Sequence, residues 1–313
     1  MLKLKALSAA VALVMTTSLC FAGCSFDFSR ISYRYDNSEK YTAGDLETKD
    51  EISNINIDYL SGGVKLTGED TDTVSVVETA NTALTEDQKV HTWVDGNTLY
   101  IRYCASTNSI SFDGIEKSID VVVPGDVKLD NLNVDITSGS FMCSDIEAGS
   151  IDADTSSGSI DVTAKASDLK LEATSGFVIL NQRGSSDSIS LSCTSGSISA
   201  VVEEADRMNL DVTSGRIEIN ANHISEINSD ITSGNSIFNF SEAPDNSNIT
   251  STSGAITVFM PEDSDITVSV DSTSGGFNYD LPFTKRSDKY IIGEGTAQMI
   301  LETTSGDIEI KAI

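Results

Sequence analysis

The chain has 313 residues, with 48 acidic against 20 basic side chains and a formal net charge of −28 at pH 7. This balance excludes a protein that binds nucleic acid or an anionic lipid surface mainly by charge. The chain has two histidines. His91 falls in an expected hairpin and His223 in an expected loop between coils, so the sequence offers little support for histidine-based catalysis.

Residues 1–23 carry the pattern of an export signal. Two lysines precede a largely apolar run from Ala6 to Cys20, which is short for a membrane span. The pair Ala22-Gly23 directly before Cys24 resembles the bacterial lipobox, although Phe21 stands where leucine is usual. We expect cleavage before Cys24 and lipidation of its thiol, which anchors the mature protein to an extracytoplasmic membrane surface. The alternative is a plain secreted protein. Removal of residues 1–23 leaves 18 basic and 48 acidic residues, a net charge of −30.

The next hundred residues do not follow one pattern. Residues 24–50 are polar and charged, and we expect a tether there. Residues 51–127 hold a first coil and then an irregular region. Within it, Asp95-Gly96-Asn97 between two alternating segments predicts a hairpin, and Pro124-Gly125 ends a predicted strand over 119–123. This region predicts a β cap that protects the end of the following fold from edge pairing.

Residues 128–313 repeat one phrase, an apolar/polar alternation followed by Ser-Gly and a second alternation, with a first copy in 51–66. The ten glycines are Gly62, Gly139, Gly158, Gly176, Gly196, Gly215, Gly234, Gly254, Gly275 and Gly306. From Gly139 to Gly275 the intervals are 19, 18, 20, 19, 19, 20 and 21 residues. This is the length of one coil of a β-solenoid. The sequence therefore predicts an all-β fold, a stack of coils with two short strands per coil. An antiparallel β-sandwich with repetitive turns is the alternative.

The apolar residues of each repeat stand seven and five positions before the glycine, and two and four positions after it. A spacing of two is the period of a strand, so these columns are expected to face inward. By the same parity, the serine before each glycine is expected to point inward and to satisfy backbone groups at the bend. Cys143 and Cys193 fall in inward columns three coils apart, too far for a disulfide, and are expected to be buried thiols.

Four residues before the glycine, eight of the ten copies have an acid, and parity places this column outside. An Asn-rich column stands two residues earlier. Three interpretations remain open: a solvated face, a ladder of carboxylates bridged by Ca²⁺, or a surface that binds a glycan or a protein. The residues of the cation ladder would be Asp135, Asp154, Glu172, Asp211 and Asp230. No other cofactor is expected. A carboxylate pair for glycoside hydrolysis is also available, but a catalytic site should break the repeat, and these acids follow it.

The last interval, from Gly275 to Gly306, is 31 residues long and contains an insertion at about 281–296. Its segment Leu281-Pro282-Phe283-Thr284 is similar to a cell-wall sorting motif. Lys285 replaces the final glycine of that motif and no apolar tail follows, so we reject this function. The role of the basic stretch Lys285–Lys289 stays open.

Residues 41–311 resemble a bacterial family of adhesin-like domains of unknown function. The resemblance rests on Tyr41-Thr42-Ala43-Gly44, on Ile55-x-Ile57 before Ser61-Gly62, on Asp95-Gly96-Asn97-Thr98-Leu99-x-Ile101, and on Val121-x-Val123-Pro124. It implies a right-handed β-helical stack and a surface location. It implies no catalytic residues.

Three functions follow from these observations. The first is a non-enzymatic, lipid-anchored surface protein that serves as an adhesin or envelope scaffold through its acidic face. Its partners would be the membrane, through the lipid, and an unknown surface glycan or protein, with no nucleic acid. The second is an accessory or sensor protein in envelope-stress signalling. The third is a polysaccharide-processing β-helix enzyme.

Overall fold

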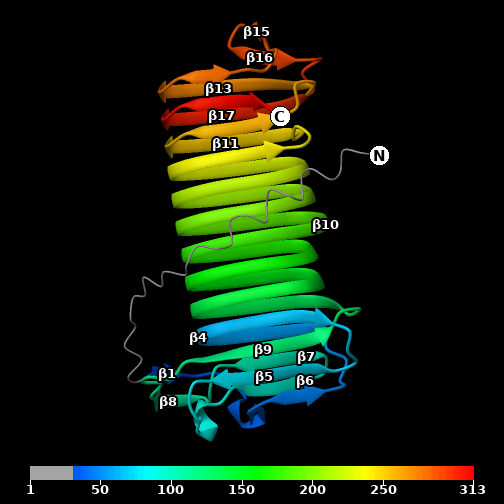
Figure 1. Ribbon diagram of the computed structural model, residues 1–313, viewed down its shortest axis with the longest axis vertical. Coiled ribbons are helices and arrows are strands. Elements are labelled where there is room, and N and C mark those ends of the chain that lie inside the picture. Colours follow the sequence, from blue (N-terminus) through cyan, green and yellow to red (C-terminus); the bar gives the residue numbers. More distant parts are fainter. Residues whose placement is uncertain (1–30) are drawn as a thin grey trace.

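The computed structural model describes residues 31–313, so the export signal and Cys24 lie outside the described residues. The chain forms an elongated β-solenoid with a cap at one end and a hairpin at the other (Figure 1). Most of the solenoid is one continuous ribbon, β10 (Lys128–Phe240), that stacks in parallel on β4 (Asn54–Glu69). Helical structure in the described part consists of two 3-10 turns, η2 (Ser38–Lys40) and η3 (Glu86–Gln88).

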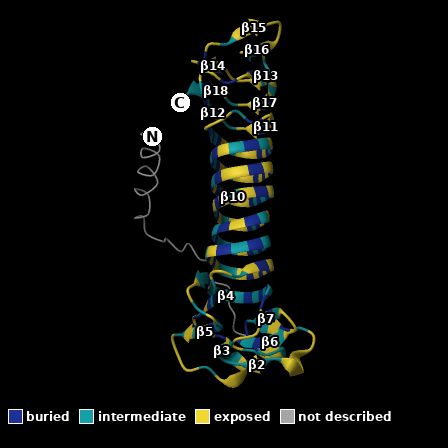
Figure 2. Ribbon diagram, turned by 90° about the vertical axis from the view of Figure 1, so that its right-hand side faces the viewer, coloured by how far each residue is buried: buried dark blue, intermediate teal, exposed yellow. Residues whose placement is uncertain are grey.

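The predicted inward columns form the core. Leu132 and Ile217 are fully buried, and their partners in neighbouring coils are buried with them. Along β10 buried and exposed residues alternate, which gives the banded pattern of Figure 2. Cys143 and Cys193 are buried free thiols, as expected from their positions. Burial raises the pKa of the Cys143 thiol to about 12, so at neutral pH it behaves as a small apolar side chain.

The expected inward orientation of the corner serines is wrong. Ser195, Ser214 and Ser233 are exposed. The inward position is instead three residues before the glycine, in a column that includes Cys193 and Val212. The reason is geometric. The chain bends over the whole Thr-Ser-Gly corner, and a bend that spans three residues resets the strand alternation before the second strand starts.

The corner glycines are required by two effects together. Gly215 has φ 153°, in a region that residues with a side chain avoid. A Cβ atom built on Gly215 would also overlap the carbonyl oxygen of Gly196 in the neighbouring coil. The same overlap recurs from coil to coil along the glycine column. The backbones of successive corners are therefore stacked too closely for any other residue.

The N-terminal cap continues the stack beyond β4 and then closes it. Its strands are β1 (Ile31–Tyr33), β2 (Thr42–Ala43), β3 (Leu46–Thr48), β5 (Val74–Ala80), β6 (His91–Asp95), β7 (Thr98–Arg102), β8 (Thr107–Ile110) and β9 (Lys117–Pro124). Strands β7 and β9 pair in parallel with the two halves of β4. The predicted hairpin is β6–β7, and the predicted strand before Pro124 is β9.

The cap also includes much of the segment that was expected to be a tether. Strands β1, β2 and β3 pair with β8, β6 and β5, all in antiparallel fashion. Residues from Ile31 onward are therefore part of the fold. The local pattern of residues does not predict these pairs, because each of these strands has only two or three residues and pairs with a segment far along the chain.

The C-terminal end departs from sequential stacking. Its strands are β11 (Asn246–Ser253), β12 (Ile256–Met260), β13 (Ile266–Ser274), β14 (Phe277–Tyr279), β15 (Thr284–Arg286), β16 (Lys289–Ile292), β17 (Ala297–Ser305) and β18 (Ile308–Ala312). Strand β17 lies between β11 and β13, and β18 lies between β12 and β14. The coil of Gly306 therefore stacks between those of Gly254 and Gly275. The insertion forms the hairpin β15–β16, which pairs with β13 and lies at the far end from the cap (Figure 1).

Candidate functional site

The stacking of coils puts the outward acids in register. Asp58 pairs with Asp135, and Asn56 pairs with Asn133, across β4 and β10. The same alignment continues at the C-terminal end, where Thr250 pairs with Glu302. Since neighbouring strands are about 4.8 Å apart, one strip of carboxylate and amide groups runs along one face of the solenoid.

This face is hollowed into a shallow trough where it meets the cap. The trough has a volume of about 380 Å³ and is lined by Asn56, Ile57, Asp58, Arg102, Asn133, Val134, Asp135, Asp152, Asp154, Lys170 and Glu172. Lys170 Nζ lies 2.9 Å from Glu172 Oε2 and 3.4 Å from Asp152 Oδ1. Arg102 Nη1 donates a hydrogen bond of 2.8 Å to Asn56 Oδ1. The trough thus has five carboxylates and two cations.

The electrostatics of the trough are set by crowding of like charge. The pKa of Asp154 is raised, first by partial burial and then by the nearby carboxylates of Asp135 and Glu172. Burial is also the main cause of the raised pKa of Asp58, and the guanidinium of Arg102 opposes it. An excess of carboxylates that already repel one another favours a ligand with hydrogen-bond donors or positive charge.

The structure brings together part of the predicted ladder. Asp135, Asp154 and Glu172 share the trough, joined by Asp58 from the first coil. Asp211 and Asp230 lie further along the same face and do not line it. Among residues 31–313 no group of three or more His, Cys, Asp or Glu side chains is arranged to hold a metal ion. The cation ladder therefore stays a hypothesis.

A row of aromatic rings beside the trough was not found by sequence reasoning. The Tyr41 ring lies 4.8 Å from that of Tyr35 and 5.6 Å from that of Trp93, and Trp93 stacks on Tyr100 at 5.2 Å between ring centroids. Arg102 extends from the trough over three of these rings, the closest being Tyr100 at 5.6 Å. The predicted hairpin over 90–103 could have indicated these rings, because strand alternation places Trp93 and Tyr100 together on its outer face.

The register of β7 with β4 ties this row to the acidic face. Tyr100 pairs with Asn56, and Arg102 pairs with Asp58. The outward strip thus changes from carboxylates and amides to aromatic rings within one coil. Such a mixed surface offers flat apolar faces next to hydrogen-bonding groups.

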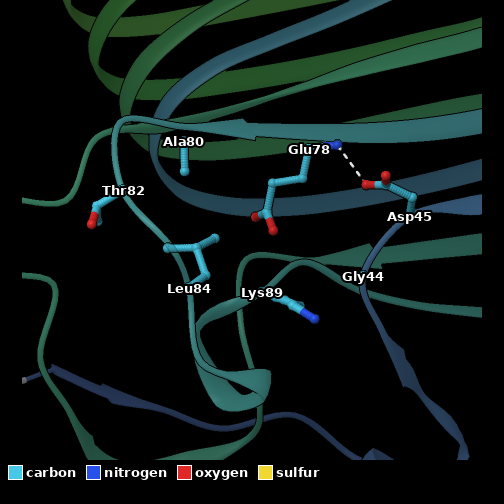
Figure 3. A pocket seen from close by; sticks show the side chains of 7 residues that line it. All are labelled: Gly44, Asp45, Glu78, Ala80, Thr82, Leu84 and Lys89. Carbon is cyan, nitrogen blue, oxygen red and sulfur yellow. Dashed lines mark hydrogen bonds between the residues drawn. The ribbon is translucent and has the colours of Figure 1, made fainter.

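A second depression lies inside the cap, lined by Gly44, Asp45, Glu78, Ala80, Thr82, Leu84 and Lys89 (Figure 3). The backbone N–H of Glu78 donates a 2.9 Å hydrogen bond to Asp45 Oδ1. The Glu78 carboxylate is itself bound to the buried ammonium of Lys117 at 2.8 Å. Asp45 and Glu78 of the depression are therefore already bonded to other groups of the cap, and we assign this depression a structural role.

The two histidines are far apart in the fold. His91 lies in β6 of the cap, where its Nδ1 is 3.0 Å from the carbonyl oxygen of Lys89. His223 lies in β10, with Nδ1 3.3 Å from Glu242 Oε2. Neither of them lines the trough. In the described part of the chain, every helix is too short to cross a membrane.

Comparison with known proteins decides the family. The family model of Toastrack DUF4097 matches residues 52–311. The chain belongs to this family. The match covers the whole stack, from the first coil to the last strand, and most of the cap. None of the curated proteins matches the chain.

Two solved structures are similar to this member of the Toastrack family. One is a candidate cell adhesion protein from Clostridium sporogenes, with 10% identity, a TM-score of 0.23, and coverage of 87% of this chain and 100% of the other. The other is a candidate adhesin from Bacteroides fragilis, with 13% identity, a TM-score of 0.39, and coverage of 86% and 96%. Likeness at this level says nothing about ligand or activity.

Proposed function

We propose that this Toastrack protein is a non-enzymatic adhesin-type protein, lipid-anchored at Cys24 on an extracytoplasmic surface, whose acidic face holds a surface glycan or protein. The observation that supports this most is the trough. It joins the aligned Asp and Asn side chains of neighbouring coils to a row of aromatic rings on one side of the stack. The sequence pattern before Cys24 supports the anchor.

The geometry suits binding better than turnover. Four of the five trough carboxylates, all except Asp152, stand in the same column as the acids of other coils, so these four follow from the repeat and not from a local departure. A repeated, shallow and open surface can align many weak contacts with a long partner, and each contact adds to the others through effective concentration.

The test uses the mature chain with Cys24→Ser, labelled and applied to intact bacterial cells and to immobilised glycans. We expect Asp135→Lys with Asp154→Lys in the trough to reduce binding by about tenfold or more. The matched control is Asp211→Lys with Asp230→Lys, which makes the same charge change on the same column outside the trough. Equal loss in both pairs, or in neither, would contradict a role for the trough. Release of reducing sugar ends from any bound glycan would overturn the non-enzymatic assignment.

A further inference from the structure

The last coil of the solenoid leaves part of its inward face uncovered. Phe277 and Tyr279 of β14 occupy the columns that Ile308 and Ile310 fill one coil earlier, where both isoleucines are fully buried. Strand β14 pairs only with β18, and no further coil follows it within the described residues. Tyr279 is accordingly 44% exposed.

The insertion covers this end only partly and adds rings of its own. Tyr290 lies 4.8 Å from Phe277 and 5.4 Å from Tyr279, measured between ring centroids, and Phe283 lies 5.4 Å from Tyr279. The four rings meet mostly edge to face, which leaves ring faces at different angles. Phe277, Phe283 and Tyr290 are half-buried against the core, and Tyr279 is exposed beside them, so part of the cluster faces solvent. A partly exposed aromatic cluster of this kind can serve as an interaction surface.

The same hairpin carries cations that lack acidic partners. Lys285, Arg286 and Lys289 are exposed, and none of them forms an ion pair with a carboxylate of residues 31–313. Lys285 Nζ instead donates to the Tyr290 hydroxyl at 3.0 Å and lies 4.9 Å from the centre of that ring. Between residues 284 and 290 only Asp288 carries negative charge. In a chain with a net charge of −28, such a local excess of positive charge is conspicuous.

We propose that this tip patch, formed by Phe277, Tyr279, Phe283, Lys285, Arg286, Lys289 and Tyr290, binds a carboxylate-bearing polysaccharide. Ring faces pack against the C–H faces of sugars, and the three cations form charge-assisted hydrogen bonds with the carboxylates. The acidic sides of the solenoid repel such a polymer, so contact is confined to the tip.

Two alternative partners fit less well. A folded protein partner commonly contacts about 20–30 residues on each side, more than the seven of the tip patch. Membrane recognition by charge usually needs a cluster of about four to eight basic residues, and the three cations of the tip fall short of that number. A polysaccharide needs only a small patch that combines rings and charge.

The position of the tip gives the site a use. The hairpin lies at the opposite end of the stack from β1, where the described chain begins (Figure 1). If the protein is anchored through Cys24, the tip is the part held furthest from the membrane. This site is separate from the trough, and the proposal does not depend on the function assigned to the trough.

The experiment measures binding of the mature chain with Cys24→Ser to polygalacturonate at low and at moderate salt. We expect the triple variant Lys285→Gln, Arg286→Gln, Lys289→Gln and the single variant Tyr279→Ser to lose about tenfold or more in affinity. A triple variant with the same net charge, Lys49→Gln, Lys65→Gln, Lys165→Gln, should bind like wild type. Melting temperatures show whether each variant is folded. If the triple variant is unfolded, the single variant Arg286→Gln replaces it, and its affinity for polygalacturonate should also be lower than that of wild type.

Three further probes separate the alternatives. Polyglutamate carries carboxylates without sugar rings, methyl-esterified polygalacturonate carries sugar without charge, and phosphatidylglycerol vesicles present anionic lipid. We expect each to bind more weakly than polygalacturonate. The trough variant Asp135→Lys with Asp154→Lys should keep its tip binding. The proposal is overturned if wild type does not bind polygalacturonate, if polyglutamate or the vesicles bind as well, or if Tyr279→Ser has no effect.

Discussion

Lys117 Nζ lies 2.8 Å from Glu78 Oε1 in the interior of the cap, with both side chains almost fully removed from solvent. The ammonium also donates to the carbonyl oxygens of Gln88 and Tyr103 and lies 4.1 Å from the centre of the Tyr103 ring. Burial lowers the pKa of Lys117, while hydrogen bonding to Glu78 opposes this effect. The main-chain carbonyl of Lys117 faces Gly62. All the other corner glycines instead face the carbonyl of the corner glycine in a neighbouring coil. Lys117 thus ends the glycine column with its backbone, and its side chain connects Glu78, Gln88 and Tyr103 of the cap.

Loss of the ammonium should destabilise the cap. Lys117→Met leaves the Glu78 carboxylate buried without a cation and should cost about 3–5 kcal/mol. Lys117→Met combined with Glu78→Leu should cost less than the two single changes added together. The control is Lys49→Met, which breaks the exposed pair of Lys49 with Asp72 and should change the free energy of unfolding little, because solvent screens this pair. Urea unfolding followed through Trp93, the single tryptophan of the chain and a cap residue, measures all four. Similar losses for Lys117→Met and Lys49→Met would contradict this role.

Two adjacent glycines should respond differently to the same substitution. Gly62 has φ 102°, and a Cβ there would overlap the Lys117 carbonyl, whereas the nearest atom to a Cβ on Gly63 is Ser118 Cβ at 3.5 Å. Gly62→Ala should therefore cost more than ~2 kcal/mol, from strain and overlap together. Gly63→Ala should change stability by less than ~1 kcal/mol. Gly196→Ala extends the test to the middle of the stack. Equal effects at Gly62 and Gly63 would show that the corner backbones are not closely stacked.

Acidification should relieve the crowded carboxylates of the trough. The folded-state pKa of Asp154 is raised above the ordinary value of 3.8, so the folded state holds this proton more tightly than the unfolded state does. The protonated Asp154 side chain therefore stabilises the fold at pH values below 3.8, and this stabilisation is lost as pH rises through the raised folded-state pKa. The melting temperature of wild type minus that of Asp154→Asn should accordingly increase as pH is lowered from 7 to about 4. Asp211→Asn, outside the trough, is the control. A difference that stays constant with pH would refute this assignment.

Divalent cations test the remaining interpretation of the column. With no group of three or more ligands in the described residues, we expect Ca²⁺ and Mg²⁺ to raise the melting temperature alike, through charge screening. Asp135→Asn with Asp154→Asn should respond as Asp211→Asn with Asp230→Asn does. A larger shift with Ca²⁺ that disappears only in the first pair would instead establish bridging between neighbouring carboxylates, because Mg²⁺ loses its water less readily.

The anchor can be tested directly. Mass spectrometry of the membrane-extracted protein should find a mature N-terminus at Cys24 that carries acyl chains. Cys24→Ser should abolish acylation and cleavage before residue 24, so the variant should carry no acyl chains and keep the mass of residues 1–23 or be cut elsewhere. A wild-type mature form that begins at another residue, or one that begins at Cys24 without acyl chains, would contradict the expected lipidation.

How much the sequence predicts depends on how local the interactions are. The register of ten Ser-Gly copies predicts the coils and the buried positions of residues such as Leu132 and Ile217, because stacking repeats each local pattern without change. The orientation of Ser195 could not be derived by counting, because parity holds only along an unbent strand. The pairing of β1 with β8 and the return of β17 involve long separations in sequence. Nothing in the local pattern of these segments encodes such contacts.

The same limit applies to the candidate site. Periodicity placed Asp135 and Asp154 on one face, but the trough also requires Arg102, which arrives from the cap. The raised pKa of Asp154 depends on how far its neighbours bury it, and spacing along the chain does not report burial. The tip patch combines β14 with a hairpin whose sequence resembles only a sorting motif that Lys285 rules out.

The return of β17 changes how the end of the stack can assemble and come apart. In a solenoid that stacks in chain order, the last coil can peel away alone, since it has one neighbour. Here the last two strands of the chain are each hydrogen-bonded on both sides, β17 to β11 and β13, and β18 to β12 and β14. The coil of β13 cannot reach its final position until residues beyond 297 have been synthesised and have filled the gap. The tip therefore reaches its place on the stack only after the C-terminal coil has formed, and a chain truncated before β17 has no coil on which β13 and β14 can stack.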